Sequence, residues 1–161
     1  HHEWRRAAAI ELVRPGDRVV DVGCGTGDLS FACLEVGART VLGLDFARPM
    51  LVRARAKAAA RGTQRASFAL GDGTRLPLAD QSVDGWCSAF VVRNIPDLDR
   101  ALSEAWRVLR PGGRLAILEI PKLGPHPLRR RSTLCPRGVS VPHARRGPPA
   151  GNAVRGRACR V

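Results

Sequence analysis

Residues 19–28 read VVDVGCGTGD, a short apolar strand, an acid, and then glycines at positions 23, 25 and 27. Glycine directly after a strand permits a tight turn and lets a ligand approach the backbone closely. The dinucleotide-binding pattern Gly-x-Gly-x-x-Gly needs a glycine at position 28, where this chain has Asp28, and a carboxylate there repels pyrophosphate. The stretch therefore favours a ligand without phosphates, with a purely structural tight turn as the alternative.

The segments around this stretch alternate between strand and helix patterns. Short apolar runs predict strands, and apolar residues that recur every three or four positions predict helices. Such alternation predicts an α/β fold with a parallel sheet, helices on both faces, and ligands beyond the carboxyl ends of the strands. The predicted strands are 18–22, 40–45, 66–70, part of 82–90, and 114–120, and the predicted helices are 4–13, 27–36, 49–61 and 97–109, the last capped by Asp97 and ended by Pro111-Gly112-Gly113.

Two further acids follow the next two predicted strands. Asp45 ends the second strand, where a carboxylate can accept both hydroxyls of a ribose, although capping of the next helix is an alternative role. Asp72 follows the third strand and can accept a hydrogen bond from an adenine amino group, although a turn role beside Gly71 and Gly73 competes. Because the glycines, Asp45 and Asp72 lie at three successive strand ends, they predict a site that surrounds one nucleoside.

The formal net charge of +13 is concentrated near the end of the 161-residue sequence. All 14 acidic residues lie before position 122, whereas residues 122–161 carry ten Lys and Arg. We expect a packed domain over residues 1–121 and a basic tail rich in Pro and Arg over 122–161 that forms no packed element. Two explanations compete for this tail. It is either the product of out-of-frame translation or a basic arm that binds nucleic acid or anionic lipid. No aromatic residue interleaves its arginines, so nucleic acid is not an expected partner.

The cysteines, the apolar runs and the first residue indicate the cellular compartment and whether a metal is expected. The five cysteines form no Cys-x-x-Cys pair and their number is odd, so neither a disulfide framework nor a metal site is expected. No apolar run suits a membrane span and no signal peptide opens the sequence, so we expect a cytoplasmic protein. Position 1 is His rather than Met, which indicates a missing or processed start.

Four stretches resemble the motif series of class I S-adenosylmethionine-dependent methyltransferases: VVDVGCGTGD, GLDFARPML, GDGTRLPLADQSVDGW and AWRVLRPGGRLAILE. The segment FVVRNIPDLDRALSEAWRVLRPGGRLAILEI, residues 90–120, closely resembles the ubiquinone/menaquinone biosynthesis C-methyltransferase family. The opening HHEWRR is similar to that family's His-x-x-Trp-Arg through His1, Trp4 and Arg5. The resemblance covers residues 1–121.

This resemblance implies a Rossmann-like three-layer sandwich with strand order 3-2-1-4-5, in which the last strands of the methyltransferase fold are missing. It implies S-adenosylmethionine as cofactor, with Asp45 on the ribose hydroxyls and Asp72-Gly73 on the adenine. The sequence departs from the family at Gly73, where Ala is usual, and at Ala89, where some members have Ser that bonds the cofactor. The residues implied to line the methionine and ribose parts are Gly23, Gly25, Thr26 and Gly27.

The implied reaction is methyl transfer to a ring carbon of a polyprenylated quinol, either demethylmenaquinol or a ubiquinone precursor. Arg93 and Asn94 follow the fourth strand and are the candidate catalytic residues. Arg93 can stabilise a developing phenolate and Asn94 can orient the ring or a water, with a solvated charge as the alternative for Arg93. Methylation of another small molecule, or nucleic-acid binding through the basic tail, is the alternative function. A lipid-tailed substrate also implies transient contact with a membrane surface.

Family members carry a segment before the His-x-x-Trp-Arg pattern and continue after the fifth strand with helices and two more strands. This sequence shows neither. The fifth strand would then be an exposed edge, and the substrate cavity would lack walls. We therefore expect most of a cofactor pocket but weak or lost activity.

Overall fold

The computed structural model describes residues 2–119, and the predicted alternation of strands and helices is confirmed there. The helices are α1 (His2–Leu12), α2 (Asp28–Glu35), α3 (Arg48–Ala60) and α4 (Leu98–Val108), with a short 3-10 helix η1 (Val92–Asn94) that was not predicted. The strands are β1 (Arg18–Val22), β2 (Thr40–Asp45), β3 (Ala66–Leu70), β4 (Val83–Ala89) and β5 (Leu109–Leu118). His1, the predicted tail and the domain boundary at residue 121 lie outside the described residues.

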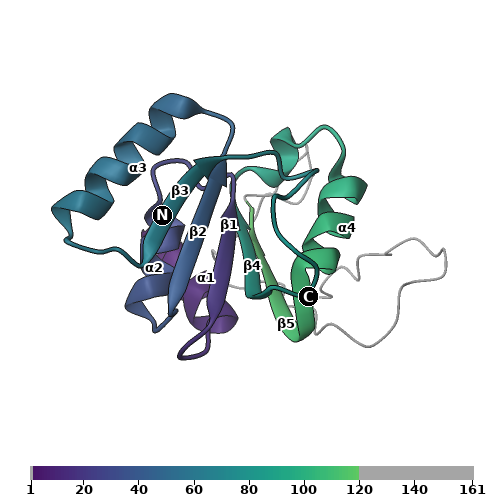
Figure 1. Ribbon diagram of the computed structural model, residues 1–161, viewed down its shortest axis with the longest axis horizontal. Coiled ribbons are helices and arrows are strands. Elements are labelled where there is room, and N and C mark those ends of the chain that lie inside the picture. Colours follow the sequence, from purple (N-terminus) through teal and green to yellow (C-terminus); the bar gives the residue numbers. More distant parts are fainter. Residues whose placement is uncertain (1, 120–161) are drawn as a thin grey trace, which may run out of the picture.

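The five strands form one parallel sheet in the order β3-β2-β1-β4-β5 (Figure 1), which confirms the expected order. β1 lies at the centre, and its Asp21 pairs with Gly43 of β2 on one side and Cys87 of β4 on the other. β2 and β3 follow β1 in the sequence and lie on one side of it, and β4 and β5 lie on its other side. The order of the strands reverses between β1 and β4, and ligands of open α/β sheets bind beyond the carboxyl ends at such a point.

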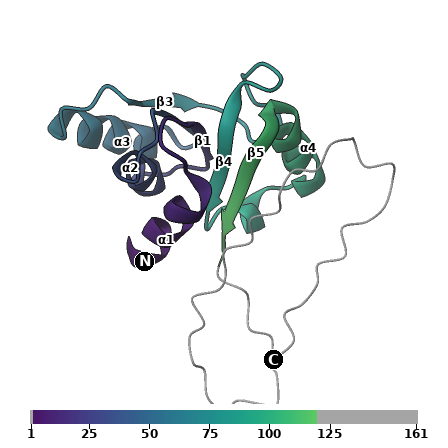
Figure 2. The same cartoon turned by 90° about the horizontal axis from the view of Figure 1, so that it is seen from below.

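Helices cover both faces of the sheet, as Figure 2 shows from below. Buried residues of α1, α2 and α3 form one apolar cluster, whereas α4 contributes to a second cluster. Successive side chains of a strand point to opposite faces. Val19 of β1 accordingly belongs to the first cluster, and Val20 and Val22 belong to the second. Residues 2–119 therefore form the expected three-layer α/β sandwich.

The limits and the buried face of α4 follow from its sequence. Asp97 caps it as predicted, since its Oδ1 accepts the N–H of Arg100 at 2.9 Å. Ala101, Ala105 and Val108 recur at helical spacing and are buried. Neither α4 nor any other helix of residues 2–119 is long and apolar enough to cross a membrane.

The start of β5 differs from the prediction. The sequence predicts a strand from residue 114 after a Pro-Gly-Gly turn, but β5 begins at Leu109, directly after α4. Val83 pairs with Leu109 and Gly85 pairs with Arg114, so the register of β4 and β5 shifts and residues 110–113 form a bulge. Proline and glycine mark turns as well as bulges, and the pattern alone does not separate the two.

Candidate functional site

The glycine loop, residues 23–27, joins β1 to α2 through three left-handed backbone positions. The φ angle is 70° at Gly23, 55° at Gly25 and 82° at Gly27. Side chains are also excluded by space at two positions, because an ideal Cβ would lie 2.5 Å from Val91 at Gly23 and 2.8 Å from Phe68 at Gly27. A Cβ at Gly25 would meet nothing within 4 Å. The loop therefore presents bare backbone to open space at Gly25, where a ligand can come close.

Asp45, at the carboxyl end of β2, ties the glycine loop to the neighbouring strand. Its Oδ2 accepts the N–H of Gly25 and its Oδ1 accepts the N–H of Ala47, both at 2.8 Å. Each carboxylate oxygen has a second lone pair, so the side chain can still accept two hydroxyl groups. Asp45 is not itself the N-cap residue of α3, which is Ala47, but its bond to the Ala47 N–H holds the start of that helix.

Asp72 and Gly73 follow β3 and lie beside the glycine loop. An ideal Cβ on Gly73 would lie 2.8 Å from Val22, the residue that precedes the loop. Asp72 is exposed, and its Oδ1 accepts both the N–H and the hydroxyl of Thr74 at 2.8 Å. These two bonds hold the pKa of Asp72 below its ordinary value. The turn role expected as an alternative is therefore present, and Asp72 stands at this edge as an ionised acceptor.

Lys57 of α3 reaches the far end of the glycine loop and was missed by sequence reasoning. Its Nζ lies 2.9 Å from Oγ1 of Thr26 and 2.6 Å from Oδ1 of Asp28. Burial raises the pKa of Asp28, but the hydrogen bond and charge of Lys57 outweigh it and hold that pKa below its ordinary value. The N-cap residue of α2 is Gly27, and no side-chain capping bond is made there.

The candidate catalytic residues Arg93 and Asn94 lie in η1, toward β5 and away from β3. Nη1 of Arg93 lies 3.5 Å from Oε1 of Glu119, and the Arg93 backbone N–H donates to Oε2 at 3.4 Å. The Arg93 side chain is 42% exposed, so the alternative of a solvated charge stays open beside this ion pair. Glu119 was not predicted, although an acid at a strand end is the same signal that singled out Asp45. The residue of this segment that lies against Gly23 is Val91.

Asp21, the acid of the opening stretch, lies in β1 beneath the glycine loop. It is 1% exposed, and its Oδ2 accepts the hydroxyl of Ser30 at 2.6 Å. Its Oδ1 has no hydrogen-bond partner among residues 2–119. Burial raises the pKa of Asp21 to about 6 and outweighs the Ser30 bonds and the charge of Arg5, which lower it.

Cys24, the first residue after Gly23, is a buried free thiol. Burial and the charges of Asp21 and Asp45 raise its pKa, so it stays protonated and is a poor nucleophile. In the part of the chain that the structure describes, no group of three His, Cys, Asp or Glu side chains could hold a metal ion.

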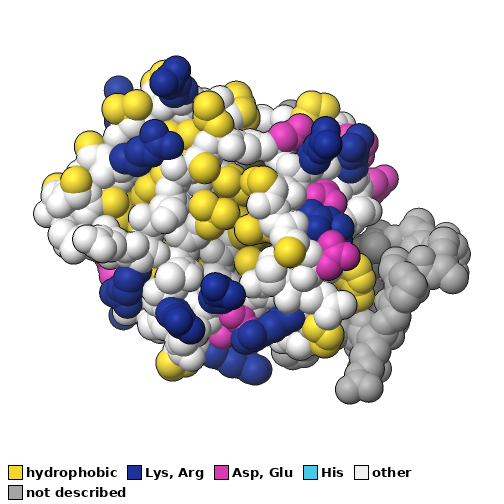
Figure 3. Space-filling model, in the orientation of Figure 1, with side chains coloured by type: hydrophobic (Ala, Val, Ile, Leu, Met, Phe, Trp, Pro, Cys, Tyr) yellow, Lys and Arg dark blue, Asp and Glu magenta, His cyan; other side chains and the backbone are white. Residues whose placement is uncertain are grey.

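The residues around the loop fit a nucleoside-containing group. Phe46, which follows Asp45, is 80% exposed, and Leu70, at the end of β3, is 56% exposed. Side chains of this size offer an apolar surface for a base, and Figure 3 shows hydrophobic side chains gathered on the face between α3 and α4. Open backbone at Gly25, spare acceptors on Asp45 and an exposed ring at Phe46 match the needs of a ribose and a base.

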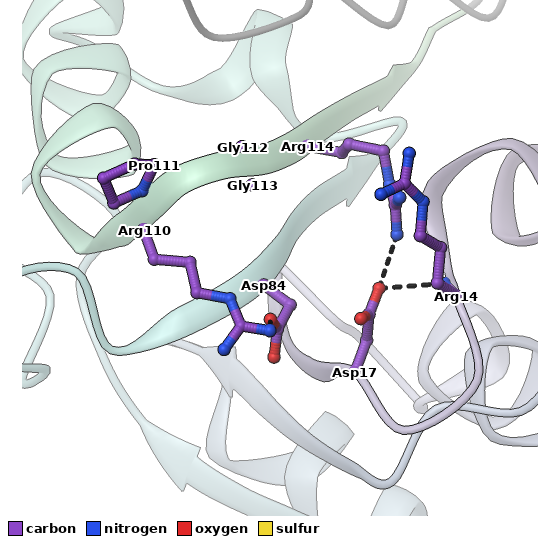
Figure 4. Close-up of a pocket in the computed structure, with 8 residues that line it drawn as sticks. All are labelled: Arg14, Asp17, Asp84, Arg110, Pro111, Gly112, Gly113 and Arg114. Atoms are coloured by element: carbon purple, nitrogen blue, oxygen red, sulfur yellow. Dashed lines mark hydrogen bonds and ion pairs between the residues drawn. The ribbon is translucent and has the colours of Figure 1, made fainter. Parts of the chain in front are cut away.

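A cavity of about 240 Å³ lies at the opposite edge of the sheet, by the amino ends of β1, β4 and β5 (Figure 4). Both of its acids are paired with arginines, because Nη2 of Arg114 lies 2.5 Å from Oδ2 of Asp17 and Arg110 pairs with Asp84. Arg114 also donates to the carbonyl of Leu12, which joins α1 to β5. The cavity is lined by a structural ion-pair network and is separate from the strand ends that carry the predicted site.

Comparison with known proteins places the sequence among methyltransferases. A sequence model described as the ubiE/COQ5 methyltransferase family matches residues 1–134. The demethylmenaquinone methyltransferase of Thermus thermophilus is 44% identical over 120 residues, which cover 73% of this chain and 54% of that protein. The ubiquinone/menaquinone biosynthesis C-methyltransferase UbiE of Methylobacterium nodulans is 42% identical over 125 residues, which cover 74% of this chain and 49% of that protein.

Solved structures agree with this grouping. An S-adenosylmethionine dependent methyltransferase from Mesorhizobium loti is 32% identical, with a TM-score of 0.62 over 73% of this chain and 53% of that one. The chain spans about half the length of the curated relatives it matches. The matched residues include the glycine loop, the three strand ends and the Arg93–Glu119 pair.

Asp21→Asn tests the burial of this carboxyl through the pH dependence of stability. An acid whose pKa is higher in the folded than in the unfolded chain costs stability above that pKa. For Asp21 the cost is absent well below its ordinary pKa of 3.8, grows up to about 6, and is then full. We expect the free energy of unfolding of the variant, relative to the parent, to rise by roughly 2–3 kcal/mol between pH 4 and pH 8.

Urea unfolding at several pH values measures this difference. Asp99→Asn, at an exposed position in the first turn of α4, is the control variant. A stability difference between Asp21→Asn and the parent that is the same at pH 4 and pH 8 would contradict the burial of an ionisable carboxyl at this position.

Proposed function

Because this chain belongs to the ubiE/COQ5 methyltransferase family, we propose that its strand-end site binds S-adenosylmethionine and directs the methyl group to a ring carbon of a quinol. The observation that carries the proposal is the bond from the N–H of Gly25 to Asp45, which sets a carboxylate beside an open backbone turn. S-adenosylmethionine has a ribose and a base but no phosphate. Asp28, directly after the loop, disfavours a pyrophosphate and is compatible with this ligand.

The proposed placement follows the strand order. The adenine lies at the end of β3, where its amino group donates to Asp72 and its ring contacts Gly73, and the ribose lies at the end of β2 and donates from its two hydroxyls to Asp45. The methionine part then lies over the glycine loop, at Gly23, Gly25, Thr26 and Gly27. The structure supports this placement because the side chain of Asp45 contacts the loop directly and Gly73 lies against Val22.

Phe46 is a further proposed contact that the sequence did not single out. It directly follows Asp45 and is 80% exposed, an unusual state for a large aromatic side chain. An aromatic ring beside the acceptor of the ribose hydroxyls can stack on the attached adenine. Burial of Phe46 under the base would remove its exposed apolar area from water and contribute to affinity.

S-adenosylmethionine, when bound, supplies an electrophilic methyl group. The protein must hold the acceptor carbon in line with that group and assist loss of a proton from the neighbouring hydroxyl. Arg93 can stabilise the phenolate that results, and Asn94 can orient the ring. Glu119, which lies 3.5 Å from Arg93, supplies a carboxylate that can accept the proton.

The proposed acceptor is a quinol with a polyprenyl tail, on the basis of the demethylmenaquinone and ubiquinone/menaquinone activities named for the relatives. Such a substrate resides in a membrane, so the enzyme, which we place in the cytoplasm, would touch the membrane surface during turnover. A panel of quinols and unrelated phenols separates this acceptor from another small molecule.

Asp45→Ala tests the cofactor proposal. We expect the parent chain to bind S-adenosylmethionine saturably in a calorimetric titration, and the variant to bind it about 100-fold more weakly, because two hydrogen bonds to a charged acceptor and one loop contact are lost. Circular dichroism checks that each chain is folded. Asp99→Ala, which removes an exposed acid on α4, is the control. A folded parent that binds no cofactor, or an Asp45→Ala variant that binds as the parent does, would refute the proposal.

Arg93→Met tests the catalytic assignment. With the protein in excess and a short-chain quinol as acceptor, we expect the single-turnover rate of methyl transfer to fall about 100-fold, the usual effect of losing one donor to a developing oxyanion. The affinity for S-adenosylhomocysteine should not change, since Arg93 lies on the β5 side of the edge. Arg48→Met, at an exposed position in the first turn of α3, is the control. An unchanged transfer rate would remove Arg93 from the catalytic residues.

A further inference from the structure

The cavity of about 240 Å³ at the amino ends of β1, β4 and β5 carries a surplus of positive charge. Its charged lining residues are three arginines and two acids, namely Arg14, Arg110, Arg114, Asp17 and Asp84. A cavity with a surplus cation attracts an anionic ligand. Because this edge of the sheet lies opposite the glycine loop, what binds here is independent of the proposed cofactor.

Both acids are already held by groups of the protein. Oδ2 of Asp17 accepts the backbone N–H of Arg14 at 2.8 Å and lies 2.5 Å from Nη2 of Arg114. Oδ2 of Asp84 accepts a backbone N–H at 2.8 Å, and the same carboxylate pairs with the guanidinium of Arg110. Asp17 and Asp84 are 8% and 5% exposed. One carboxylate is therefore matched to Arg114 and the other to Arg110, which leaves the guanidinium of Arg14.

Arg14 is exposed and follows α1, and its guanidinium makes no hydrogen bond or ion pair within residues 2–119. Its charge nevertheless acts on Arg114. Burial lowers the pKa of Arg114, Asp17 raises it, and the charge of Arg14 lowers it again. Figure 4 shows the side chains of Arg14 and Arg114 at the same end of the cavity. Two cations therefore share one carboxylate there, and an anion between them would relieve their repulsion.

The bulge of β5 brings open backbone to the same cavity. Gly112 has a left-handed φ of 83°, and an ideal Cβ there would meet nothing within 4 Å. Gly113 has no room for a side chain, because an ideal Cβ would lie 2.9 Å from the carbonyl oxygen of Arg110. Glycine lets a ligand approach the backbone closely, and backbone N–H groups in turns attract anions. The bulge is therefore open to a ligand at Gly112.

We propose that this cavity binds a phosphate group, with Arg14 and Arg114 as its cationic donors. A guanidinium presents parallel N–H donors that match the oxygens of a phosphate. Arg114 is 6% exposed and is held in place by Asp17 and by the carbonyl of Leu12, whereas Arg14 supplies the second cation from the exposed side. Because Leu12 ends α1, a bound phosphate would join the end of that helix to β5.

The size of the cavity allows two sources of the phosphate group. A molecule of liquid water takes about 30 Å³, so a cavity of about 240 Å³ has room for a phosphate with a small substituent. Free phosphate and the phosphate ester of a small molecule share the chemistry that the arginines recognise.

The test titrates the isotope-labelled full chain with inorganic phosphate and with glycerol 3-phosphate at constant ionic strength. Amide chemical shifts locate each ligand, and their dependence on concentration gives its dissociation constant. The variants are Arg14→Met, Arg14→Lys and Arg39→Met, and the dispersion of the amide spectrum shows that each is folded. Arg39 is the matched control, because it is an exposed arginine directly before β2, at the same edge, and does not line the cavity.

We expect saturable shifts at Gly112, Gly113 and Arg114. Arg14→Met should weaken binding about tenfold or more, because a charge-assisted hydrogen bond is lost. Arg14→Lys keeps the charge without the planar group and should retain part of the affinity, and Arg39→Met should retain all of it. Tighter binding of the ester would identify a phosphorylated small molecule as the ligand, and equal or weaker binding would identify free phosphate.

Three results would overturn the site: no saturable shifts in the folded parent, shifts confined to residues outside the cavity, or an equal loss of affinity in Arg14→Met and Arg39→Met. The last result would mean that phosphate responds only to the general positive charge of this edge. None of them bears on the proposed cofactor site at the opposite edge.

Discussion

The carboxylate of Asp45 joins the segments on which the candidate site depends. Gly25 can keep its left-handed turn open to a ligand because its N–H already has an acceptor in Asp45. The same side chain fixes Ala47 at the start of α3, and the backbone carbonyl of Asp45 accepts the N–H of Gly71 at 3.1 Å. One residue at the end of β2 therefore sets the positions of three loops. The residue is 7% exposed, so these bonds are largely shielded from water.

The two edges of the sheet use charge in different ways. At the amino ends of the strands, Asp17 and Asp84 are buried and paired with Arg114 and Arg110, so their charges serve to hold β1, β4 and β5 together. At the carboxyl ends, Asp45 and Asp72 bond only backbone or hydroxyl groups and keep acceptor capacity. Acceptor capacity at Asp45 and Asp72 therefore remains for the proposed ligand.

The fold was largely predictable from the sequence because it depends on local signals. Short apolar runs, glycine after strands and the Asp97 cap are each readable within a few residues, and the structure confirms the elements they predict. The start of β5 was not predictable. It depends on the register shift between the Val83–Leu109 and Gly85–Arg114 pairs, and a register is a property of two paired strands rather than of one segment. Helix η1 was also missed, since a single 3-10 turn leaves no periodic pattern.

The sequence could predict candidate site residues only where the position at the end of a strand marks them. Asp45 stands out because it ends a strand, and Asp72 because it closely follows one. Lys57 and Glu119 act through partners 31 and 26 positions away, and a sequence without its fold does not reveal such pairs. Asp21 was visible as an acid in the opening stretch, but its raised pKa comes from burial in the assembled sheet.

The most direct test of the account is to locate the bound cofactor. Amide chemical shifts of the isotope-labelled chain, measured with and without S-adenosylhomocysteine, would show which backbone groups sense the ligand. The account predicts shifts at Gly23, Gly25, Phe46 and Gly73, along the carboxyl ends of three strands, and none at Gly112 or Gly113 in the cavity of Figure 4. Shifts confined to that cavity, or no shifts in a folded chain, would contradict it.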